Sequence, residues 1–411
     1  MSGKIIAIAV VAILIVAGAA AAIVFMGGGE KSDASGLSIV GRVNSEGSGI
    51  ILNQGEYPTD YITETTIHPG LGAKYIFNED TDTYYVFNTA NWGGKVFATP
   101  GMATIQHVQL WDLATMMGLK FVSYTENMKT ESDTLYYVAG VPSFAEFENK
   151  LKTAPLSGYI IWEAQYSVGI ERGYPGLALT NELFNGHTCC IIGASNKYLS
   201  TEANTFEVFL SVYSKAVDKI NAALADKTSE DYATLLSIAT NRVSMPDSLT
   251  PQQKEDAIKK ALDNVTYLYA DDAKGSLVDL TDGISSLAKT LYEAGQIEKS
   301  AQDLGFKSYD AMAKKFVNDS YIKKALKGDF EPLTLKKKIN VAAISGDIHQ
   351  IAIWYAMDTK MFDAANLEVN VFPQSNGPGV YVLLANGEAD IGFLGAPPMT
   401  IRSMNGEDIK A

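Results

Sequence analysis

Three short polar stretches in the last quarter of the chain have residue types suited to holding an anion. They are SGDIHQ (345–350), QSNGPG (374–379) and GAPP (395–398), and each stands between an apolar run and a helix-like pattern. The first N–H groups of a helix have no partner within the helix, and the positive end of its dipole lies there. Each stretch therefore presents backbone donors that can bind a small oxyanion without a basic side chain.

The elements that must position these stretches predict a parallel α/β unit. Apolar, β-branched runs predict three strands, at 338–345, 367–372 and 389–395. Helical spacing follows each run, with Asp347 at an N-cap position and Pro397 opening the third helix. Such short connections predict right-handed crossovers and a parallel sheet, whose carboxyl-end edge is where ligands bind.

Composition limits the classes of function. The chain has 411 residues, which indicates two or three units, and its 47% hydrophobic and 19% charged residues are ordinary for a globular protein with a core. The net charge is −14 and no Lys/Arg stripe is interleaved with aromatics, so nucleic-acid binding is not expected. The two cysteines, Cys189 and Cys190, are adjacent; they match no zinc-ligand spacing and do not indicate the redox compartment.

The N-terminus predicts a membrane anchor. Residues 5–26 carry no charge and, at about 1.5 Å per residue, are long enough to span a bilayer. Lys4 on the short side predicts that the N-terminus lies inside and the bulk of the chain outside. The segment AGAAAA also offers a cleavage site, so a cleaved signal is the alternative. The following GGGEKSDASG is expected to be a flexible tether, and the lack of a nearby cysteine excludes a lipoprotein-type anchor.

The middle of the chain predicts further strands and a run of amphipathic helices. Strands are expected in LSIVGRVN (37–44), GGKVFATPG (93–101), LSGYIIWEAQ (156–165) and NGHTCCIIGAS (185–195). A helix is expected in MATIQHVQLWDLATMMGL, with an apolar face of Ile105, Val108, Trp111 and Met116 or Met117. More helices are expected at 204–225, 229–242, 250–265, 276–294 and 308–327. The Tyr-, Thr- and Asp-rich residues 53–93 predict a hairpin-like insertion.

Together these stretches resemble a known family. KINVAAISGDIHQIAIWYAMDTKMF, LEVNVF, LLANGEADIGFLGAPP, NSEGSGIIL, GGKVFATPGMATIQHVQL, IIWEAQYSVGIERGY and GHTCCII are similar to motifs of the solute-binding proteins of ABC importers for nitrate, sulfonates, taurine and bicarbonate. The resemblance covers most of the chain, although only NGEADIGFLGAPP and GHTCC are fairly specific. It implies an α/β fold of the two-lobed type 2 periplasmic-binding-protein kind, with the ligand in a cleft that closes by a hinge.

The order of the motifs differs from the family's order. The stretch that the family places first, KINVAAIS, here lies near the end, and the chain stops in GEDIKA, where a fourth strand begins. Joining Ala411 to Leu37 restores one strand and the family's order, so we expect a circularly permuted chain. A fused or truncated tandem gene, and exchange of segments between two chains, are the alternatives.

The resemblance also divides the chain into regions. It implies an anchor and tether (1–36), a lobe 1 strand with the first hinge crossover (37–52), an insertion (53–92), lobe 2 (93–185), a second crossover with helices that pack on lobe 1 (186–338), and the parallel β/α unit of lobe 1 (339–411). The family usually has a short link where the insertion stands. The insertion would cover the cleft or contact a partner.

In lobe 1 the resemblance and the edge positions imply ligand contacts from the first and third turns, namely Ser345, Asp347, His349 and Gln350, and Gly395, Ala396 and Pro397. Glu46 and Ser48 lie where the chain would cross between the lobes, and the glycines beside them would allow the bend. Each group has a structural alternative. GAPP would be a plain helix start, His349 a helix-surface residue, and Glu46 with Ser48 a hinge.

In lobe 2 the expected contacts are Thr104 and His107 at a second helix N-terminus, and Trp162 and Glu163 at a strand end. The indole would wall the ligand, and the carboxylate would accept from an amine, as in taurine, or pair with a lobe 1 donor. His187 lies on the second crossover beside the two cysteines, which are expected to be small buried side chains. A vicinal disulfide, and a metal site of His187, a cysteine and Glu163, are the alternatives.

The resemblance implies a membrane-anchored receptor on the extracytoplasmic side of the cell membrane, and no enzyme. It would deliver a small anion, such as a sulfonate, taurine, nitrate or bicarbonate, to an ABC permease. The ATPase would be a separate chain, because no GxxxxGK[ST] loop occurs here. No cofactor or metal is expected. The alternatives are a thiamine-type pyrimidine binder or a pyrimidine-synthesis enzyme of the same fold, and a cell-surface sensor without transport.

Overall fold

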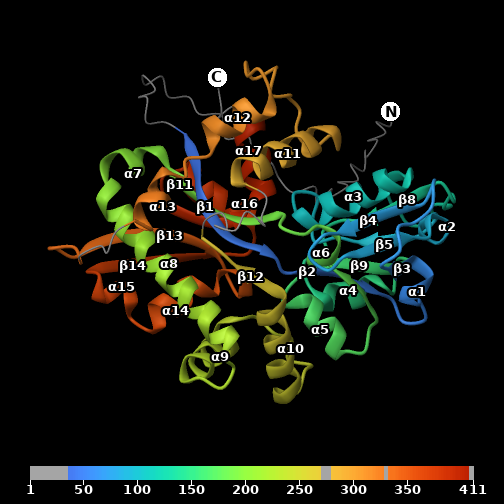
Figure 1. Cartoon of the computed structure of the whole chain (residues 1–411), viewed down its shortest axis with the longest axis horizontal. Coiled ribbons are helices and arrows are strands. Elements are labelled where there is room, and N and C mark those ends of the chain that lie inside the picture. The colour runs from blue at the N-terminus through green and yellow to red at the C-terminus, as the bar shows by residue number, and fades with distance from the viewer. Residues whose placement is uncertain (1–35, 270–278, 328–331, 407–411) are drawn as a thin grey trace, which may run out of the picture. The chain divides into compact units, whose positions relative to one another are not determined.

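The computed structural model describes residues 36–269, 279–327 and 332–406. These residues form two six-stranded sheets, called sheet A and sheet B below, and one three-stranded sheet, sheet C (Figure 1). The predicted membrane span at 5–26, its tether and the strand start at 408–411 lie outside the described residues. Inside them, no helix has both the length and the apolar character to cross a membrane.

Sheet A contains the predicted parallel unit together with strands from the other end of the chain. Its order is β12 (Val265–Tyr267), β1 (Leu37–Glu46), β11 (Thr188–Ser195), β15 (Ile391–Gly395), β13 (Lys337–Ile344), β14 (Leu367–Gln374). Strands β14, β13 and β15 are parallel, and β11 is antiparallel to both β15 and β1. Strand β1 therefore runs in the same direction as the three parallel strands, with β11 between β1 and β15.

Sheet B repeats this pattern. Its order is β10 (Gly176–Leu179), β2 (Ser48–Leu52), β9 (Leu156–Trp162), β6 (Val96–Ala98), β8 (Thr134–Val138), β7 (Lys120–Ser123). Strands β8, β6 and β9 are parallel, while β2 is antiparallel to β9 and to β10. Both sheets thus have a run of parallel strands, then one reversed strand, then one strand in the original direction. Sheet B has four strands in its parallel run, because β7 is parallel to β8, whereas sheet A has three and ends in a second reversed strand, β12.

The reversed strand of each sheet is reached from the other sheet. Strand β2 follows β1 directly after Gly47, and β11 follows β10 through α6 (Thr180–Leu183). We call residues 46–48 the first crossover and residues 184–188 the second crossover. Because each sheet is completed by a strand that the other sheet supplies, residues Ala34–Ala411 cluster as one compact unit.

Helices follow the carboxyl ends of the parallel strands, as the sequence predicts. In sheet A they are the 3-10 turn η1 (Ile348–Gln350), α14 (Ile351–Asp358), α15 (Met361–Ala364), α16 (Gly377–Ala385) and α17 (Ala396–Asn405). In sheet B they are α3 (Ile105–Met117), α4 (Phe144–Lys150) and α5 (Gln165–Glu171). The side chains of Asp347, Asn376 and Thr104 cap η1, α16 and α3, each by accepting a backbone N–H.

The predicted helical run is present with one correction. The helices are α7 (Asn196–Thr201), α8 (Ala203–Ala225), α9 (Glu230–Arg242), α10 (Pro251–Asn264), α11 (Leu280–Glu293), α12 (Tyr309–Phe316) and α13 (Ser320–Ala325). The single helix expected at 308–327 is wrong, because the chain leaves the helix after Phe316. Val317 forms a β-bridge with Ile39, and the Asn318 N–H donates to the Ile39 carbonyl at 2.7 Å. A tertiary contact with β1 therefore overrides the local helical pattern.

The insertion is larger than the predicted hairpin. It contains α1 (Pro58–Tyr61), β3 (Ile62–Thr65), β4 (Lys74–Asn78), β5 (Thr83–Phe87) and α2 (Thr89–Trp92), and its strands form sheet C in the order β3-β5-β4. Trp92 is fully buried and stacks on Phe97 of sheet B with ring centroids 5.1 Å apart. Tyr61 meets the Trp92 ring edge-on. These rings anchor sheet C to sheet B.

Both faces of each six-stranded sheet are covered by apolar side chains. Along β1, Val40 and Val43 belong to one cluster with α8, α9 and α14, while Leu37 and Ile39 belong to another with α11, α16 and α17. Along β2, Ile50 and Ile51 likewise join different clusters. Sheets buried on both faces explain why the strands are continuous apolar runs in the sequence.

Candidate functional site

The first crossover is a bend in the backbone that three segments hold in place. Glu46 and Gly47 both have positive φ, of 64° and 83°. The Gly47 carbonyl accepts hydrogen bonds from the Glu163 N–H at 2.8 Å and from Nε2 of His349 at 2.9 Å. A Cβ at Gly47 would lie 2.4 Å from that imidazole nitrogen and 2.8 Å from a Val265 methyl group. Only glycine fits this position.

His349 is a buried cation at the first turn of sheet A. Its Nδ1 lies 2.6 Å from a carboxylate oxygen of Asp347, and its Nε2 faces the Gly47 carbonyl. Both ring nitrogens face acceptors, so both are protonated. Burial would lower the pKa of His349, but the charge and hydrogen bond of Asp347 raise it to about 9. The sequence-predicted His349 therefore joins the turn after β13 to the first crossover.

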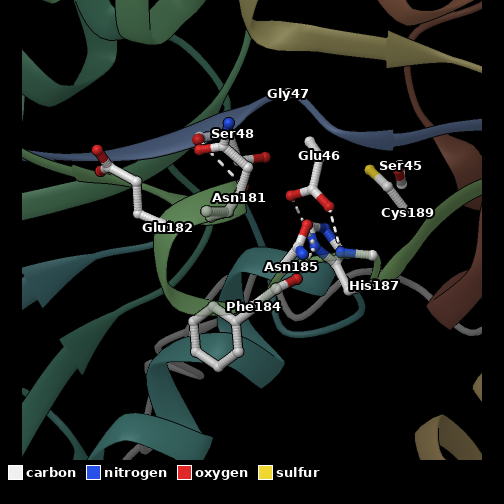
Figure 2. Close-up of polar contacts among 12 residues, drawn as sticks. Ser45, Glu46, Gly47, Ser48, Asn181, Glu182, Phe184, Asn185, His187 and Cys189 are labelled. Carbon is white, nitrogen blue, oxygen red and sulfur yellow. Dashed lines mark hydrogen bonds and ion pairs between the residues drawn. The ribbon is translucent and has the colours of Figure 1, made fainter. Parts of the chain in front are cut away.

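An ion pair joins the two crossovers. Figure 2 shows the Glu46 carboxylate pointing toward His187 from across the site. One Glu46 oxygen accepts the Gly186 N–H at 2.6 Å, and the other lies 3.4 Å from Nδ1 of His187. Burial opposes protonation of His187, yet the negative charge of Glu46 and the nearby Cys189 raise its pKa to about 10. The expected residues Glu46 and His187 are thus brought together.

Glu163 is buried and has partners of its own. Its carboxylate accepts from the Ser167 N–H and hydroxyl at 3.1 and 3.0 Å, and from the Asn264 amide at 2.7 Å. Burial raises its pKa despite these donors. The expected neighbour Trp162 is half-buried and packs against a sheet B cluster. Because three donors already occupy the carboxylate, it has little capacity left for the amine of a ligand.

The lobe 2 candidates Thr104 and His107 make their contacts within sheet B. Thr104 caps α3 by accepting the His107 N–H, and Nδ1 of His107 lies 3.2 Å from the Thr99 hydroxyl. The imidazole packs edge-on against Phe121 and Tyr137. Burial without a nearby carboxylate lowers the pKa of His107 to about 4, so this histidine is neutral.

Other sequence-predicted residues act as supports. Gln350 closes the ends of two strands by accepting the Ile344 N–H at 2.8 Å and donating to the Phe393 carbonyl at 3.1 Å. Ser48 accepts from the Gln106 amide at 2.8 Å, which joins the first crossover to α3. Ser345 is exposed, and its N–H donates to the Gln374 carbonyl.

The starts of α16 and α17 lie next to each other. A Cβ on Gly377 would come within 2.7 Å of the Pro398 ring and 3.8 Å of the Gly395 nitrogen. Gly395 is the N-cap of α17, and Ala396 with Pro397 forms its buried first turn. Two helix N-termini therefore converge at the edge where the sequence predicts ligand contacts.

Four further buried polar side chains, on β1, β11 and α3, were not predicted from the sequence. Among the described residues, no partner is present for the Gln109 amide, the Ser45 and Thr188 hydroxyls, or the Asn44 amide oxygen, and all four residues are at least 95% buried. Ser45 and Thr188 face each other across β1 and β11. An unsatisfied buried polar group costs about 1–3 kcal/mol, so a polar ligand that pairs with them would be bound favourably.

Gln109 connects this group to sheet B. It lies one helical turn beyond Gln106, which bonds Ser48 of the first crossover. Its neighbour Val108 belongs to the apolar cluster that contains Val380 of α16 and Ala396 of α17. The expected apolar face of this helix is correct at Val108 and Met117, but the deeply buried positions also include Gln106, His107 and Gln109. Helix α3 thus buries two amide side chains, of which that of Gln106 donates to Ser48.

The described residues do not contain a metal-type cluster. Within residues 36–269, 279–327 and 332–406, no three His, Cys, Asp or Glu side chains are arranged to hold a metal ion. His187 and Glu163 belong to separate hydrogen-bond networks, at Glu46 and at Ser167 with Asn264. The arrangement is suited to binding through backbone N–H groups and neutral donors.

Comparison with known proteins gives two solved structures. No protein-family model and no curated protein sequence matches the chain. The crystal structure of the periplasmic nitrate-binding protein NrtA from Synechocystis PCC 6803 has a TM-score of 0.42 and 12% identity, covering 71% of this chain and 68% of that one. A structure from Bordetella bronchiseptica RB50 has a TM-score of 0.40 and 16% identity, covering 71% and 75%.

Proposed function

We propose that this chain is an extracytoplasmic solute-binding receptor of an ABC importer, which holds a small anion between sheet A and α3. One observation carries the proposal. Two sheets, each with a run of parallel strands followed by a reversed strand, are joined by two crossovers, and buried polar side chains without partners among the described residues lie on β1, β11 and α3. Pockets between two α/β units commonly bind small ligands in this way.

The binding mechanism follows from the donors. The first turns of η1, α16 and α17 supply backbone N–H groups, and the Gln109 amide with the Ser45 and Thr188 hydroxyls supplies neutral donors. The fixed charge of His349 lies at the same turn, paired with Asp347. The anion would thus be bound by fixed backbone dipoles rather than by a mobile basic side chain. Such a site does not require an excess of basic residues, which this chain of net charge −14 does not have.

Release of the solute would use the crossovers as hinges. Glu46 and Gly47 hold the bend at one of them, and His187 holds the other through its ion pair with Glu46. Breaking the His349 and Glu46 contacts would free both crossovers at once, and the two sheets would rotate apart. Sulfonates, taurine, nitrate and bicarbonate are the candidate anions. The Glu163 carboxylate, which already accepts three hydrogen bonds, does not favour an amine-bearing ligand among them.

The proposal includes the expected permutation, anchor and partners. Strand β1 runs parallel to β13, β14 and β15 within one sheet, which supports a permuted order of the family's strands. The uncharged residues 5–26 support an anchor in the cell membrane by their sequence alone. The partners would be a permease and a separate ATPase chain.

A thermal-shift screen tests the function. The full chain in detergent is melted with nitrate, bicarbonate, taurine, alkanesulfonates and thiamine-type pyrimidines. An anion at about 100 times its dissociation constant adds ~2.7 kcal/mol to the native state and raises the melting temperature. A shift with pyrimidines alone, or no shift with any anion, would contradict the proposal.

A further inference from the structure

Cys189 and Cys190 lie side by side, although neighbouring residues of a strand normally point to opposite faces. Both thiols are free and buried, and their Sγ atoms are 3.8 Å apart. The cause is a β-bulge. Ser45 pairs with Thr188 and Asn44 pairs with Cys190, so Cys189 is the extra residue on β11. Both cysteines consequently join the same apolar cluster.

The surroundings of the pair favour one thiolate beside one thiol. A hydrogen bond with Cys190 lowers the pKa of Cys189, and the neighbouring His187 and the charge of His349 hold it well below its usual value although burial opposes this. The same hydrogen bond, burial and the Cys189 charge raise the pKa of Cys190. A thiolate is the nucleophile in disulfide exchange, and the second thiol is placed to resolve the product.

We propose that Cys189 and Cys190 are a redox site that forms a reversible vicinal disulfide on the second crossover. The oxidant is a small disulfide. The Cys189 thiolate attacks one sulfur of the oxidant, which forms a mixed disulfide and releases one thiolate. Cys190 then loses its proton and attacks the Cys189 sulfur, which closes the Sγ–Sγ bond and releases the second thiol. Two electrons pass from the cysteine pair to the oxidant.

The proposed disulfide is strained, and this makes it reversible. Adjacent Cα atoms are about 3.8 Å apart, whereas bridged cysteines usually have Cα atoms about 4.4–6.8 Å apart. Strained disulfides have more oxidising potentials and are readily reduced, as a switch requires. The thiols are buried, so the oxidant reaches them when the crossover opens locally.

The position of Cys190 links the redox site to the proposed ligand site. Cys190 pairs with Asn44 on one side and with Gly395 on the other. Closing the vicinal disulfide would shift the strand between these two residues. This consequence rests on the proposed function, whereas the disulfide itself does not.

The experiment measures the disulfide directly. The folded full chain in detergent is equilibrated in buffers of increasing oxidised-to-reduced glutathione ratio. It is then acid-quenched, unfolded in denaturant so that the buried thiols are accessible, alkylated and analysed by mass spectrometry. We expect two alkylated cysteines under reducing conditions, and neither alkylated, with two hydrogens lost, under oxidising conditions. Dithiothreitol should restore both. Cys189→Ser and Cys190→Ser should each give only a mono-glutathione adduct or a free thiol. Full alkylation at every ratio, or glutathione adducts without an intramolecular bond in the native chain, would overturn the proposal.

A second measurement tests the role of His187 as a positioning residue. His187→Gln should slow oxidation at pH 7 at least tenfold. The rate should recover as the pH rises, because the Cys189 thiol then ionises without the charge of His187. His68→Gln, which changes an exposed histidine of the insertion, is the matched control and should leave the rate unchanged. Equal rates in both variants would remove His187 from the proposal. Anion binding is assayed separately on the oxidised and the reduced chain. If no anion binds, the proposed function fails, but the disulfide detected by mass spectrometry is unaffected.

Discussion

His349 and His107 occupy equivalent places in the two sheets but carry different charges. Each follows a strand that has a parallel neighbour on both sides, β13 in sheet A and β6 in sheet B, and each is 2–3% exposed. His349 lies between a carboxylate and a carbonyl, and its pKa rises to about 9. His107 lies between a hydroxyl and two aromatic rings, and its pKa falls to about 4. Burial alone therefore does not determine the charge of a histidine; its partners do.

The two histidines have different structural roles in the two sheets. The charge on His349 joins the first turn of sheet A to the crossover through Gly47. The neutral His107 is part of the aromatic packing that fixes α3 on sheet B. A charged histidine linked to the first crossover in sheet A thus contrasts with a neutral histidine in the aromatic packing of sheet B. The predictions below challenge this contrast, beginning with the largest expected effect.

His349→Leu should be the most destabilising of these substitutions, by about 3–5 kcal/mol near pH 6.5, because it leaves Asp347 and the Gly47 carbonyl without their cation. The pKa of His349 is about 9 in the folded chain against an ordinary value of 6.5. Its stabilisation is therefore complete below pH 6.5 and is lost as the pH rises through 9. Urea unfolding of both proteins from pH 6 to 10 checks this, and a difference that stays constant across that range would contradict a charged His349.

Gly47→Ala should cost about 2–4 kcal/mol, since it adds left-handed backbone strain and a contact with the His349 ring. The double variant Gly47→Ala/His349→Leu should lose less than the sum, because removing the imidazole removes its clash. Urea unfolding of the wild type, the two single variants and the double variant at pH 7 gives the coupling free energy between Gly47 and His349. Gly55→Ala is the control, with a positive φ of 93° and no atom near the added methyl group. If both glycine variants lose the same stability, the contact with His349 is not the cause.

His107→Leu should cost only about 1 kcal/mol at pH 7, the value of the lost hydrogen bond to Thr99. Its pH dependence should be opposite to that of His349→Leu. Since the folded pKa of about 4 lies below the ordinary 6.5, the wild type loses stability as the pH falls from 6.5 toward 4, and the leucine variant lacks this loss. Thermal unfolding of both proteins at pH 4.5 and pH 7 measures how the stability difference between them changes with pH. An unchanged difference would mean that His107 has no lowered pKa.

Gln109→Leu should change stability least, by about 0.5 kcal/mol or less, because an unpaired buried amide is replaced by an apolar side chain. The affinity for the anion should nevertheless fall at least about tenfold, the equivalent of one hydrogen bond. Calorimetric titration with the anion found in the screen provides the test. Gln252→Leu makes the same change on an exposed helical position and should leave the affinity as it is. Equal affinity of the two variants for the anion would show that the ligand does not bind at Gln109 of α3.

The parallel unit is the part of the fold that local patterns predict best. The strands at 337–344, 367–374 and 391–395, the cap at Asp347 and the start of α17 follow from β-branched runs, side-chain capping and the position of Pro397. The break at Val317 does not follow from such patterns, since its cause is a partner almost three hundred residues away, Ile39. Local propensity describes an element until a distant strand competes for its backbone.

The sequence indicated where the candidate site lies better than it indicated which side chains form it. Strand ends and helix starts indicate the edge, and Glu46, His187 and His349 do meet there. Gln350 and Glu163 are satisfied by protein groups, which no pattern in the sequence reveals. Gln109 was missed because an amide next to Val108 on an amphipathic helix resembles a boundary residue. Its burial appears only when α3 packs against α16 and α17.

The strand exchange between the sheets also sets an order of assembly. Every strand of sheet B lies between residues 48 and 179, so a chain emerging from the ribosome can complete that sheet early. Strand β1 emerges before all of them, yet its sheet lacks its parallel core until residues 337–395 are made. The half of the molecule that carries α3 can therefore complete its sheet before the last strands of the half that carries His349 are synthesised.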